Sequence, residues 1–304
     1  MQIWDVAIVG GGTAGMTAAI YGARAGKKVV VMEELICGGQ IVNASEVENY
    51  PGIKSISGAE FAASLYEQAA AAGASFDFRS VSGIEEQDGV KKLLTDGEPV
   101  LARTVILATG ARNRPLGLER EEALTGKGVS YCATCDGAFY RGKVTAVQGG
   151  GNTALDDALV LSGLCQQVYL IHRRDEFRGE RSQLTQVEAR PNITILRSHT
   201  VSALLGEERL SGIRIRDLKD DTERELPVDG LFVAIGQMPQ NERFHNLIEL
   251  DRSGYIVAGE DCKTSCAGVF AAGDCRTKTV RQLSTAAGDG AVAALAALDF
   301  LSRS

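Results

Sequence analysis

The chain has 304 residues, enough for two domains of ordinary size, each with a hydrophobic core of its own. Its 44% hydrophobic and 23% charged residues are typical of a soluble globular protein. The net charge of −7 argues against a nucleic-acid partner, because nucleic-acid-binding domains usually carry a basic surface. We expect a cytoplasmic protein without a membrane span, since no apolar run resembles a secretory leader or approaches about 18 residues.

Predicted strands and helices alternate along the first third of the chain. Short apolar runs rich in Val and Ile indicate buried strands, and Ala-rich segments indicate helices. Two alternating segments, 81–84 and 92–95, suggest an antiparallel addition to the sheet. We expect strands at 4–9, 28–33 and 104–110, and helices at 13–26 and 58–72.

Three glycines follow the first predicted strand. Gly10, Gly12 and Gly15 lie where this strand passes into a helix, which is the context that a dinucleotide-binding turn requires. Glu33 ends the second strand, 21 residues after Gly12. A carboxylate in this place accepts hydrogen bonds from ribose hydroxyls. The site therefore suits an adenine dinucleotide with a free ribose, such as FAD or NAD.

Cys132 and Cys135, in the order Cys-Ala-Thr-Cys, need a chemical explanation. The other five of the seven cysteines follow no disulfide framework, and thiols stay free in a reducing cytoplasm. Zinc would require two further ligands. There is no second Cys-x-x-Cys, Cys262 and Cys266 have an unsuitable spacing, and the three histidines are scattered. We therefore predict a redox-active pair and no metal site.

Residues 143–236 repeat the first scheme, with a strand, a glycine turn at 149–151 and a closing apolar strand. The residue 21 positions after Gly151 is His172, and it is followed by Arg173, Arg174 and Arg178. A carboxylate would repel a 2′-phosphate, whereas guanidinium groups bind phosphate in a bidentate way. The second site therefore suits NADPH.

A third glycine signal, at 269–274, follows the repeat, and the simplest topology returns this segment to the first domain. We predict an α/β protein of two Rossmann-like domains (FAD/NAD(P)-binding, three-layer ββα), the second inserted in the first. The FAD-binding domain would comprise 1–113 and 242–304, and the NADPH-binding domain 114–241. Two Pro-containing segments, 112–117 and 237–242, are the candidate linkers.

Together these motifs resemble low-molecular-weight bacterial thioredoxin reductases, which are class II pyridine nucleotide-disulfide oxidoreductases. The resemblance runs through nearly the whole chain. Any one glycine motif is weak support, but the ordered set is specific. Its parts lie at 10–15, 38–40, 46–52, 108–110, 132–137, 149–154, 172–174, 272–274 and 281–282.

The resemblance implies that FAD lies along the glycine turn of the first domain, with its pyrophosphate at a helix N-terminus. Glu33 would hold the ribose, and Asp274 a ribityl or phosphate group. Arg281 and Gln282 would contact the isoalloxazine. The expected FAD residues are Gly10, Gly12, Thr13, Ala14, Gly15, Glu33, Gly38, Gly39, Gln40, Asn49, Thr109, Gly110, Gly273, Asp274, Arg281, Gln282 and Leu283.

The resemblance also implies that the inserted domain holds NADPH and carries the dithiol. Hydride would pass from NADPH to FAD, then to the Cys132–Cys135 disulfide, then to oxidised thioredoxin. Cys135 would face the flavin, Cys132 would attack the protein disulfide, and Asp136 would act as the acid–base. The domains of such proteins rotate against each other, with hinges at the linkers. The expected NADPH residues are Gly149, Gly151, Asn152, Thr153, Ala154, His172, Arg173, Arg174, Arg178, Ile235 and Gly236.

Other functions stay open at this point. A flavin-dependent dithiol oxidase that uses O₂ is one alternative, although such relatives can lose the acid or the nicotinamide motif that this chain keeps. A related disulfide reductase with another donor or acceptor is a second, and a flavoprotein redox sensor without turnover is a third. A homodimer follows from the resemblance alone. Gln148, in place of an apolar residue common in relatives, raises a question about strand packing.

Overall fold

The structure is a computed structural model that describes residues 2–44, 46–87 and 89–303. The chain divides into two compact units. Unit 1 comprises residues 1–112 and 238–304, and unit 2 comprises residues 113–237. The second boundary lies four residues before the expected one, because Asn241 bonds within unit 1: its Nδ2 donates to the carbonyl oxygens of Gly254 and Cys275, both at 2.9 Å.

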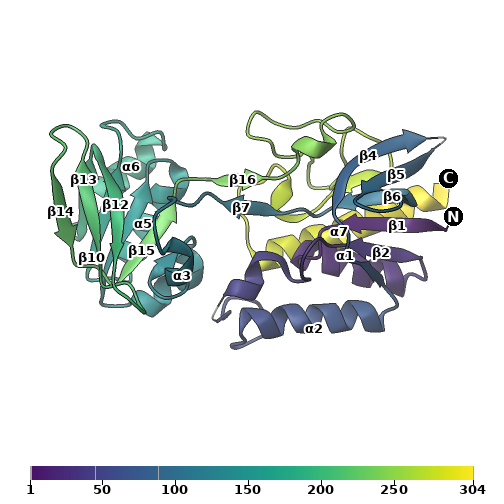
Figure 1. The fold of residues 1–304 in the computed structure, drawn as a ribbon, viewed down its shortest axis with the longest axis horizontal. Helices are drawn as coiled ribbons and strands as arrows, with labels where there is room; N and C mark the ends of the chain where they lie inside the picture. The colour runs from purple at the N-terminus through teal and green to yellow at the C-terminus, as the bar shows by residue number, and fades with distance from the viewer. Residues whose placement is uncertain (1, 45, 88, 304) are drawn as a thin grey trace. The chain divides into compact units, whose positions relative to one another are not determined.

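Unit 1 is built on a seven-stranded sheet (Figure 1). Its central strands are buried on both faces, and all four residues of β2 are inaccessible. The parallel strands are β3 (Ser75–Asp77), β2 (Val29–Met32), β1 (Ile3–Val9), β6 (Val100–Leu107) and β17 (Val269–Ala271). The antiparallel strands β4 (Val81–Gln87) and β5 (Val90–Thr95) extend the sheet from β6. One face of the central strands packs on helices and the other on β4, β5 and residues of the 244–275 segment.

The helices of unit 1 are α1 (Thr13–Arg24), α2 (Gly58–Ala71) and the C-terminal α7 (Leu283–Arg303). A capping box between Ser57 and Glu60 begins α2. Helix α7 is long and apolar enough to cross a membrane by composition, but its Ala-rich face packs against α1 in the core of this unit. A Cβ at Gly290 would lie 2.2 Å from the carbonyl oxygen of Ala14, so the two helix backbones approach closely.

Unit 2 has three layers (Figure 1). Its central sheet is parallel, in the order β11 (Ile193–Arg197), β10 (Gln167–His172), β9 (Val144–Gly149), β15 (Gly230–Ala234) and β8 (Val129–Ser130). One face packs on an antiparallel sheet of β12 (His199–Leu205), β13 (Gly212–Asp217) and β14 (Glu223–Leu226). The other packs on helices, chiefly α5 (Asn152–Ser162). The prediction of Rossmann-like ββα architecture is confirmed.

Short elements complete the chain. The two connecting segments, β7 (Ala111–Asn113) and β16 (Gln237–Pro239), pair as a two-stranded sheet, and Gln237 Nε2 donates to Asn113 Oδ1 at 3.0 Å. The remaining elements are α3 (Glu121–Leu124), α4 (Ala133–Asp136), α6 (Arg181–Glu188), η1 (Gly39–Asn43), η2 (Gly137–Tyr140), η3 (Glu242–Phe244) and η4 (Gly273–Cys275).

The question about Gln148 is resolved by its surroundings in unit 2. The side chain is buried in β9, and its Oε1 accepts a hydrogen bond from the Val201 N–H at 3.0 Å. A buried amide with this partner joins the two sheets and costs little. The strand therefore packs normally in spite of its polar residue.

Candidate functional site

The first glycine turn passes directly from β1 into α1. A Cβ at Gly15 would lie 1.9 Å from the carbonyl oxygen of Gly10, so only glycine permits this tight packing of turn and helix. Gly12 is the N-cap of α1 and no side chain caps the helix. The first amides of α1 are therefore suited to an anion, as at other helix N-termini that bind pyrophosphate.

Three of the expected FAD segments meet at this turn. The Gly38 N–H donates to the Gly11 carbonyl oxygen at 2.7 Å, and Gly12 forms an isolated β-bridge with Gly38. From the C-terminal segment, Gly273 comes so close that a Cβ there would lie 2.9 Å from Ala14 Cβ. Residues more than 230 positions apart thus line one cradle in unit 1, as the sequence motifs suggest.

Glu33 follows the last residue of β2, beside the glycine turn. Its Oε2 accepts a hydrogen bond from the Gly11 N–H at 2.8 Å, and its Oε1 accepts one from the Leu35 N–H at 3.2 Å. Each carboxylate oxygen can accept more than one hydrogen bond. The two amides therefore orient the carboxylate and leave it able to accept hydroxyl donors.

Asp274 lies in η4 and has a buried oxygen, Oδ1, that accepts no hydrogen bond from the described residues. Burial raises the pKa of this carboxyl, and the cations Lys278 and Arg281 oppose the rise. The Arg281 guanidinium lies 4.3 Å from the Tyr255 ring centroid, a cation–π arrangement. A buried acceptor without a donor costs free energy, so this oxygen is suited to a ligand hydroxyl.

The other expected FAD residues lie in unit 1 and bond to one another or to the backbone. Gln40 Nε2 donates to the Ala111 carbonyl oxygen, and Asn49 Nδ2 donates to Gln282 Oε1 at 3.3 Å. Thr109 Oγ1 donates to Oδ1 of Asn241 at 2.8 Å. Sequence reasoning missed Asn241, which is 0% exposed, because its partners come from distant segments. The remaining members Thr13, Gly39, Gly110 and Leu283 lie at helix starts or beside the turns.

The second glycine turn, in unit 2, packs on a histidine ring. A Cβ at Gly150 would lie 2.1 Å from His172 Cε1. His172 is only 4% exposed, its Nε2 lies 3.0 Å from the Glu176 carbonyl oxygen, and its ring centroid lies 4.8 Å from that of Phe177. Burial lowers the pKa of His172, with smaller effects from nearby arginines. His172 is therefore a neutral, internal support of the following loop.

That loop carries the three arginines and is bonded to the glycine turn. The Gly150 carbonyl oxygen accepts hydrogen bonds from the N–H groups of Arg178 and Gly179, at 2.7 and 3.2 Å. Arg173, Arg174 and Arg178 are exposed, and the described chain shows no ion pair to any of them. The nearby helix α5 begins at Asn152, followed by Thr153 and Ala154, while Ile235 and Gly236 follow β15. Unit 2 therefore presents cationic side chains beside a second helix N-terminus.

Cys132 and Cys135 form a disulfide in unit 2, with Cα atoms 5.3 Å apart. Cys132 is the N-cap of α4, and its Sγ accepts a hydrogen bond from the Cys135 N–H at 3.2 Å. Hydrogen bonds of this kind stabilise a thiolate relative to a thiol. The arrangement fits a redox-active centre.

Asp136 follows the disulfide directly. Its Oδ2 accepts a hydrogen bond from Ser130 Oγ at 2.6 Å. Burial raises the pKa of the Asp136 carboxyl, and the Ser130 hydroxyl opposes the rise. A carboxyl that keeps its proton nearer to neutral pH is better suited to general acid–base chemistry. Ser130 is a further residue of this centre, and its place at the end of β8 carried no signal in the sequence.

A second carboxyl, Asp157 on α5, lies beneath this region of unit 2. It is 7% exposed, and its Oδ2 is buried without a hydrogen bond from any described residue. Burial raises the pKa of Asp157 to about 7, against the effect of a hydrogen bond from the Ala133 backbone. Sequence reasoning missed it, because an aspartate in an amphipathic helix usually faces solvent.

Comparisons with known proteins agree with this arrangement. The family model described as pyridine nucleotide-disulphide oxidoreductase matches residues 4–290. The thioredoxin reductase of Treponema pallidum is 42% identical over 98% of this chain and 97% of its own, and that of Mycolicibacterium smegmatis 44% identical over 96% and 95%. The crystal structure of thioredoxin reductase from Streptococcus pyogenes matches with a TM-score of 0.94 and 36% identity, over 99% of both chains.

Proposed function

Because the chain belongs to the pyridine nucleotide-disulphide oxidoreductases, whose members use a flavin and a pyridine nucleotide, we propose that it is an NADPH-dependent thioredoxin reductase with FAD as its flavin. The observation that carries this proposal is the disulfide in unit 2 with the half-buried carboxyl of Asp136 beside it. The relatives named above are thioredoxin reductases, and their similarity to this chain covers nearly their whole length. Thioredoxin, at about −270 mV, is an acceptor that such a dithiol can reduce.

The residues of unit 1 fit FAD. The amides at the start of α1 would donate hydrogen bonds to the pyrophosphate, and the oriented Glu33 carboxylate would accept hydrogen bonds from ribose hydroxyls. The buried Asp274 Oδ1 accepts no hydrogen bond from the described chain, and a ribityl hydroxyl would supply one. Arg281, Gln282 and Leu283 would lie along the isoalloxazine.

The residues of unit 2 fit NADPH. Gly151 and the start of α5 would bind its pyrophosphate, as the first turn would in unit 1. Arg173, Arg174 and Arg178 are exposed side chains on a loop that Gly150 and His172 support. Guanidinium forks there would bind the 2′-phosphate, which NADH lacks. His172 would act by holding the loop.

FAD, when bound, supplies the step that no side chain can perform, since it accepts a hydride from a nicotinamide and passes an electron pair to a disulfide. The electron pair breaks the Cys132–Cys135 bond and leaves two sulfur anions. Asp136 gives its proton to one of them, so that a thiol and a thiolate result. The adjacent Cys135 N–H stabilises negative charge on Cys132 Sγ.

The dithiol then reduces the partner by exchange. The Cys132 thiolate attacks one sulfur of the thioredoxin disulfide, so that a mixed disulfide forms and the other thioredoxin sulfur leaves as a thiolate. Cys135, deprotonated by Asp136, next attacks Cys132 Sγ. This step re-forms the Cys132–Cys135 disulfide and releases the second thioredoxin thiolate. A homodimer in the cytoplasm is part of the proposal and rests on the resemblance to these relatives.

Steady-state oxidation of NADPH, followed at 340 nm without oxygen, tests this function. We expect rapid oxidation only when oxidised thioredoxin is present, and equal amounts of NADPH consumed and thioredoxin disulfide reduced. Consumption that requires O₂ and ignores thioredoxin would support the oxidase alternative and contradict the proposal. Bound FAD with no turnover under either condition would indicate a redox sensor.

A further inference from the structure

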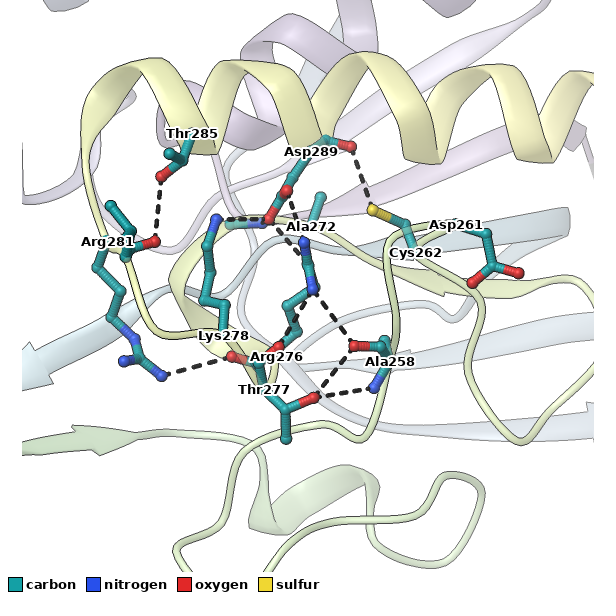
Figure 2. Close-up of polar contacts among 12 residues, drawn as sticks. Ala258, Asp261, Cys262, Ala272, Arg276, Thr277, Lys278, Arg281, Thr285 and Asp289 are labelled. Carbon is teal, nitrogen blue, oxygen red and sulfur yellow. Dashed lines mark hydrogen bonds and ion pairs between the residues drawn. The ribbon is translucent and has the colours of Figure 1, made fainter.

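A buried cluster of charges joins α7 to the segment that carries Asp274 (Figure 2). Asp289 on α7 accepts two hydrogen bonds from the Arg276 guanidinium. Nε donates to Oδ2 and Nη2 donates to Oδ1, both at 2.8 Å. Lys278 Nζ lies 2.8 Å from Oδ2. The three side chains are 11%, 7% and 8% exposed, respectively. Charges so far from water are tolerated only when they are paired and hydrogen-bonded.

The same carboxylate holds the backbone of the turn in front of Asp274. The Gly273 N–H donates to Asp289 Oδ2 at 3.0 Å. Arg276 also reaches other segments, since its Nη1 donates to the carbonyl oxygens of Ala258 and Thr277 at 3.3 and 3.1 Å. One carboxylate therefore fixes η4, the residues after it and the start of α7 relative to each other.

The charges of the cluster extend to Asp274. Arg276 and Lys278 carry two positive charges, and Asp289 balances one of them. The ionised Asp274 carboxyl would balance the second, and both Lys278 and Arg281 act on it electrostatically in this direction. Asp289 opposes them, and Tyr255 lies within range of the same carboxyl. Lys278 is thus the cation that Asp289 and Asp274 share.

We propose that Asp289 is a positioning residue for the flavin site, which fixes the place of Asp274 by accepting the Gly273 N–H and both cations. This inference rests on the proposed binding of FAD in unit 1. Asp289 touches the backbone and the two cations, and it acts on a flavin only through Asp274. Replacing Asp289 with Asn would leave one buried positive charge unbalanced and only one acceptor oxygen for the Gly273 N–H and the two cations, so the turn would lose its fixed geometry.

The rate of FAD release from the holoenzyme tests this role, because flavin fluorescence rises when FAD leaves a protein. We expect Asp289→Asn to release FAD at least tenfold faster than the wild type. Asp299→Asn is the matched control, since Asp299 lies on the same helix and forms an exposed ion pair with Arg303. It should release FAD at the wild-type rate. Equal rates for Asp289→Asn and the wild type would overturn the inference.

A second measurement separates positioning from general damage. With FAD in large excess, we expect Asp289→Asn to recover wild-type turnover with thioredoxin and an unchanged KM for NADPH, because only occupancy of the flavin site is impaired. Binding of 2′,5′-ADP, a probe of the NADPH site in unit 2, should stay unchanged. Turnover that stays low at saturating FAD would show a wider defect and overturn the role.

If Asp289→Asn does not fold, Arg276→Lys replaces it as the test variant. Lysine keeps the buried positive charge but cannot form the bidentate contact, so we expect FAD release to be faster by about threefold. No change would again overturn the inference. A wild-type protein that binds no FAD at all would reject the proposed function itself. If the wild type binds FAD and Asp289→Asn retains it equally well, only the role of Asp289 is rejected.

Discussion

The backbone N–H of Gly11 lies 2.8 Å from Oε2 of Glu33, so the glycine turn holds the carboxylate that ends the neighbouring strand. This contact joins two features that the sequence separates by 22 positions. The parallel register of β1 and β2 places them side by side, with Val9 opposite Met32. The carboxylate is therefore oriented without a ligand, and if it binds the proposed ribose this orientation would reduce the entropy lost on binding.

Glu33→Ala should weaken FAD binding by roughly 1.5–3 kcal/mol, the usual worth of a hydrogen bond to a charged group. Glu33→Gln keeps an acceptor for the Gly11 N–H, and its affinity for FAD should fall between those of the wild type and Glu33→Ala. FAD release measured by flavin fluorescence gives the ranking. Glu34→Ala, at the exposed neighbouring position, is the control. A Glu33→Ala protein that held FAD like the wild type would contradict the ribose assignment.

Much of this arrangement could be predicted, because the glycine turns and the strands before them are local patterns. Residues 29–32 and 105–107 are continuous apolar runs, as buried parallel strands usually are, and the structure has strands there. Strand β6 begins four residues before the prediction, at Val100. Its first residues alternate in burial and pair with β5, and the charged Arg103 and polar Thr104 separate them from the apolar run that marked the rest.

Several supporting side chains could not be predicted, since their contacts depend on how the elements pack. Asn241 meets Thr109, which lies 132 positions earlier, and both residues are polar ones typical of loops. Asp157 approaches the redox pair only because α5 packs beside α4. Ser130 lies six residues before Asp136, and its hydroxyl reaches that carboxylate through the turn between them. Nothing in the sequence indicates that His172 is buried, because its burial under Gly150 depends on how the turn and strand meet.

The double variant Arg173→Ala with Arg174→Ala should raise the KM for NADPH by about 10- to 100-fold, as expected for the loss of charged hydrogen bonds of roughly 1.5–3 kcal/mol. The KM for NADH should stay the same, because NADH has no 2′-phosphate. Arg190→Ala, exposed elsewhere on unit 2, is the control. Steady-state kinetics with both nucleotides decides the question. An unchanged ratio of the two KM values would remove the phosphate assignment.

Asp136→Asn should lower the turnover number with thioredoxin by about 100-fold or more, the usual contribution of a general acid. Reduction of the enzyme by NADPH should stay fast, since that step needs no proton from Asp136. The raised pKa of Asp136 means that it keeps its proton to a higher pH than an ordinary aspartate. The turnover number of the wild type should therefore fall as pH rises through that pKa, because Asp136 loses its proton. The pH profile of the variant should lack this decrease. Wild-type turnover by Asp136→Asn would exclude the acid role.

Asp157→Asn should stabilise the protein at alkaline pH. The pKa of Asp157 is about 7 in the folded state and near 3.8 when unfolded. The protonated Asp157 therefore contributes its full stabilisation below the lower value, and this contribution is lost as pH rises towards 7, where the buried carboxyl must ionise. Between pH 5 and pH 8 the advantage of the variant should grow by roughly 3 kcal/mol, from two pKa units at about 1.4 kcal/mol each. Urea unfolding of both proteins at the two pH values measures it. A difference that is independent of pH would refute the buried ionisation.

Anaerobic stopped-flow absorbance at the flavin band tests the complete relay most directly. The purified protein is mixed with NADPH or NADH, and then with oxidised thioredoxin. We expect NADPH to bleach the band rapidly, NADH to do so far more slowly at the same concentration, and thioredoxin to restore the colour. In Cys135→Ser, NADPH should still bleach the band but thioredoxin should not restore it. Restoration by thioredoxin in this variant, or equal bleaching by both nucleotides, would contradict a relay from NADPH through the Cys132–Cys135 pair.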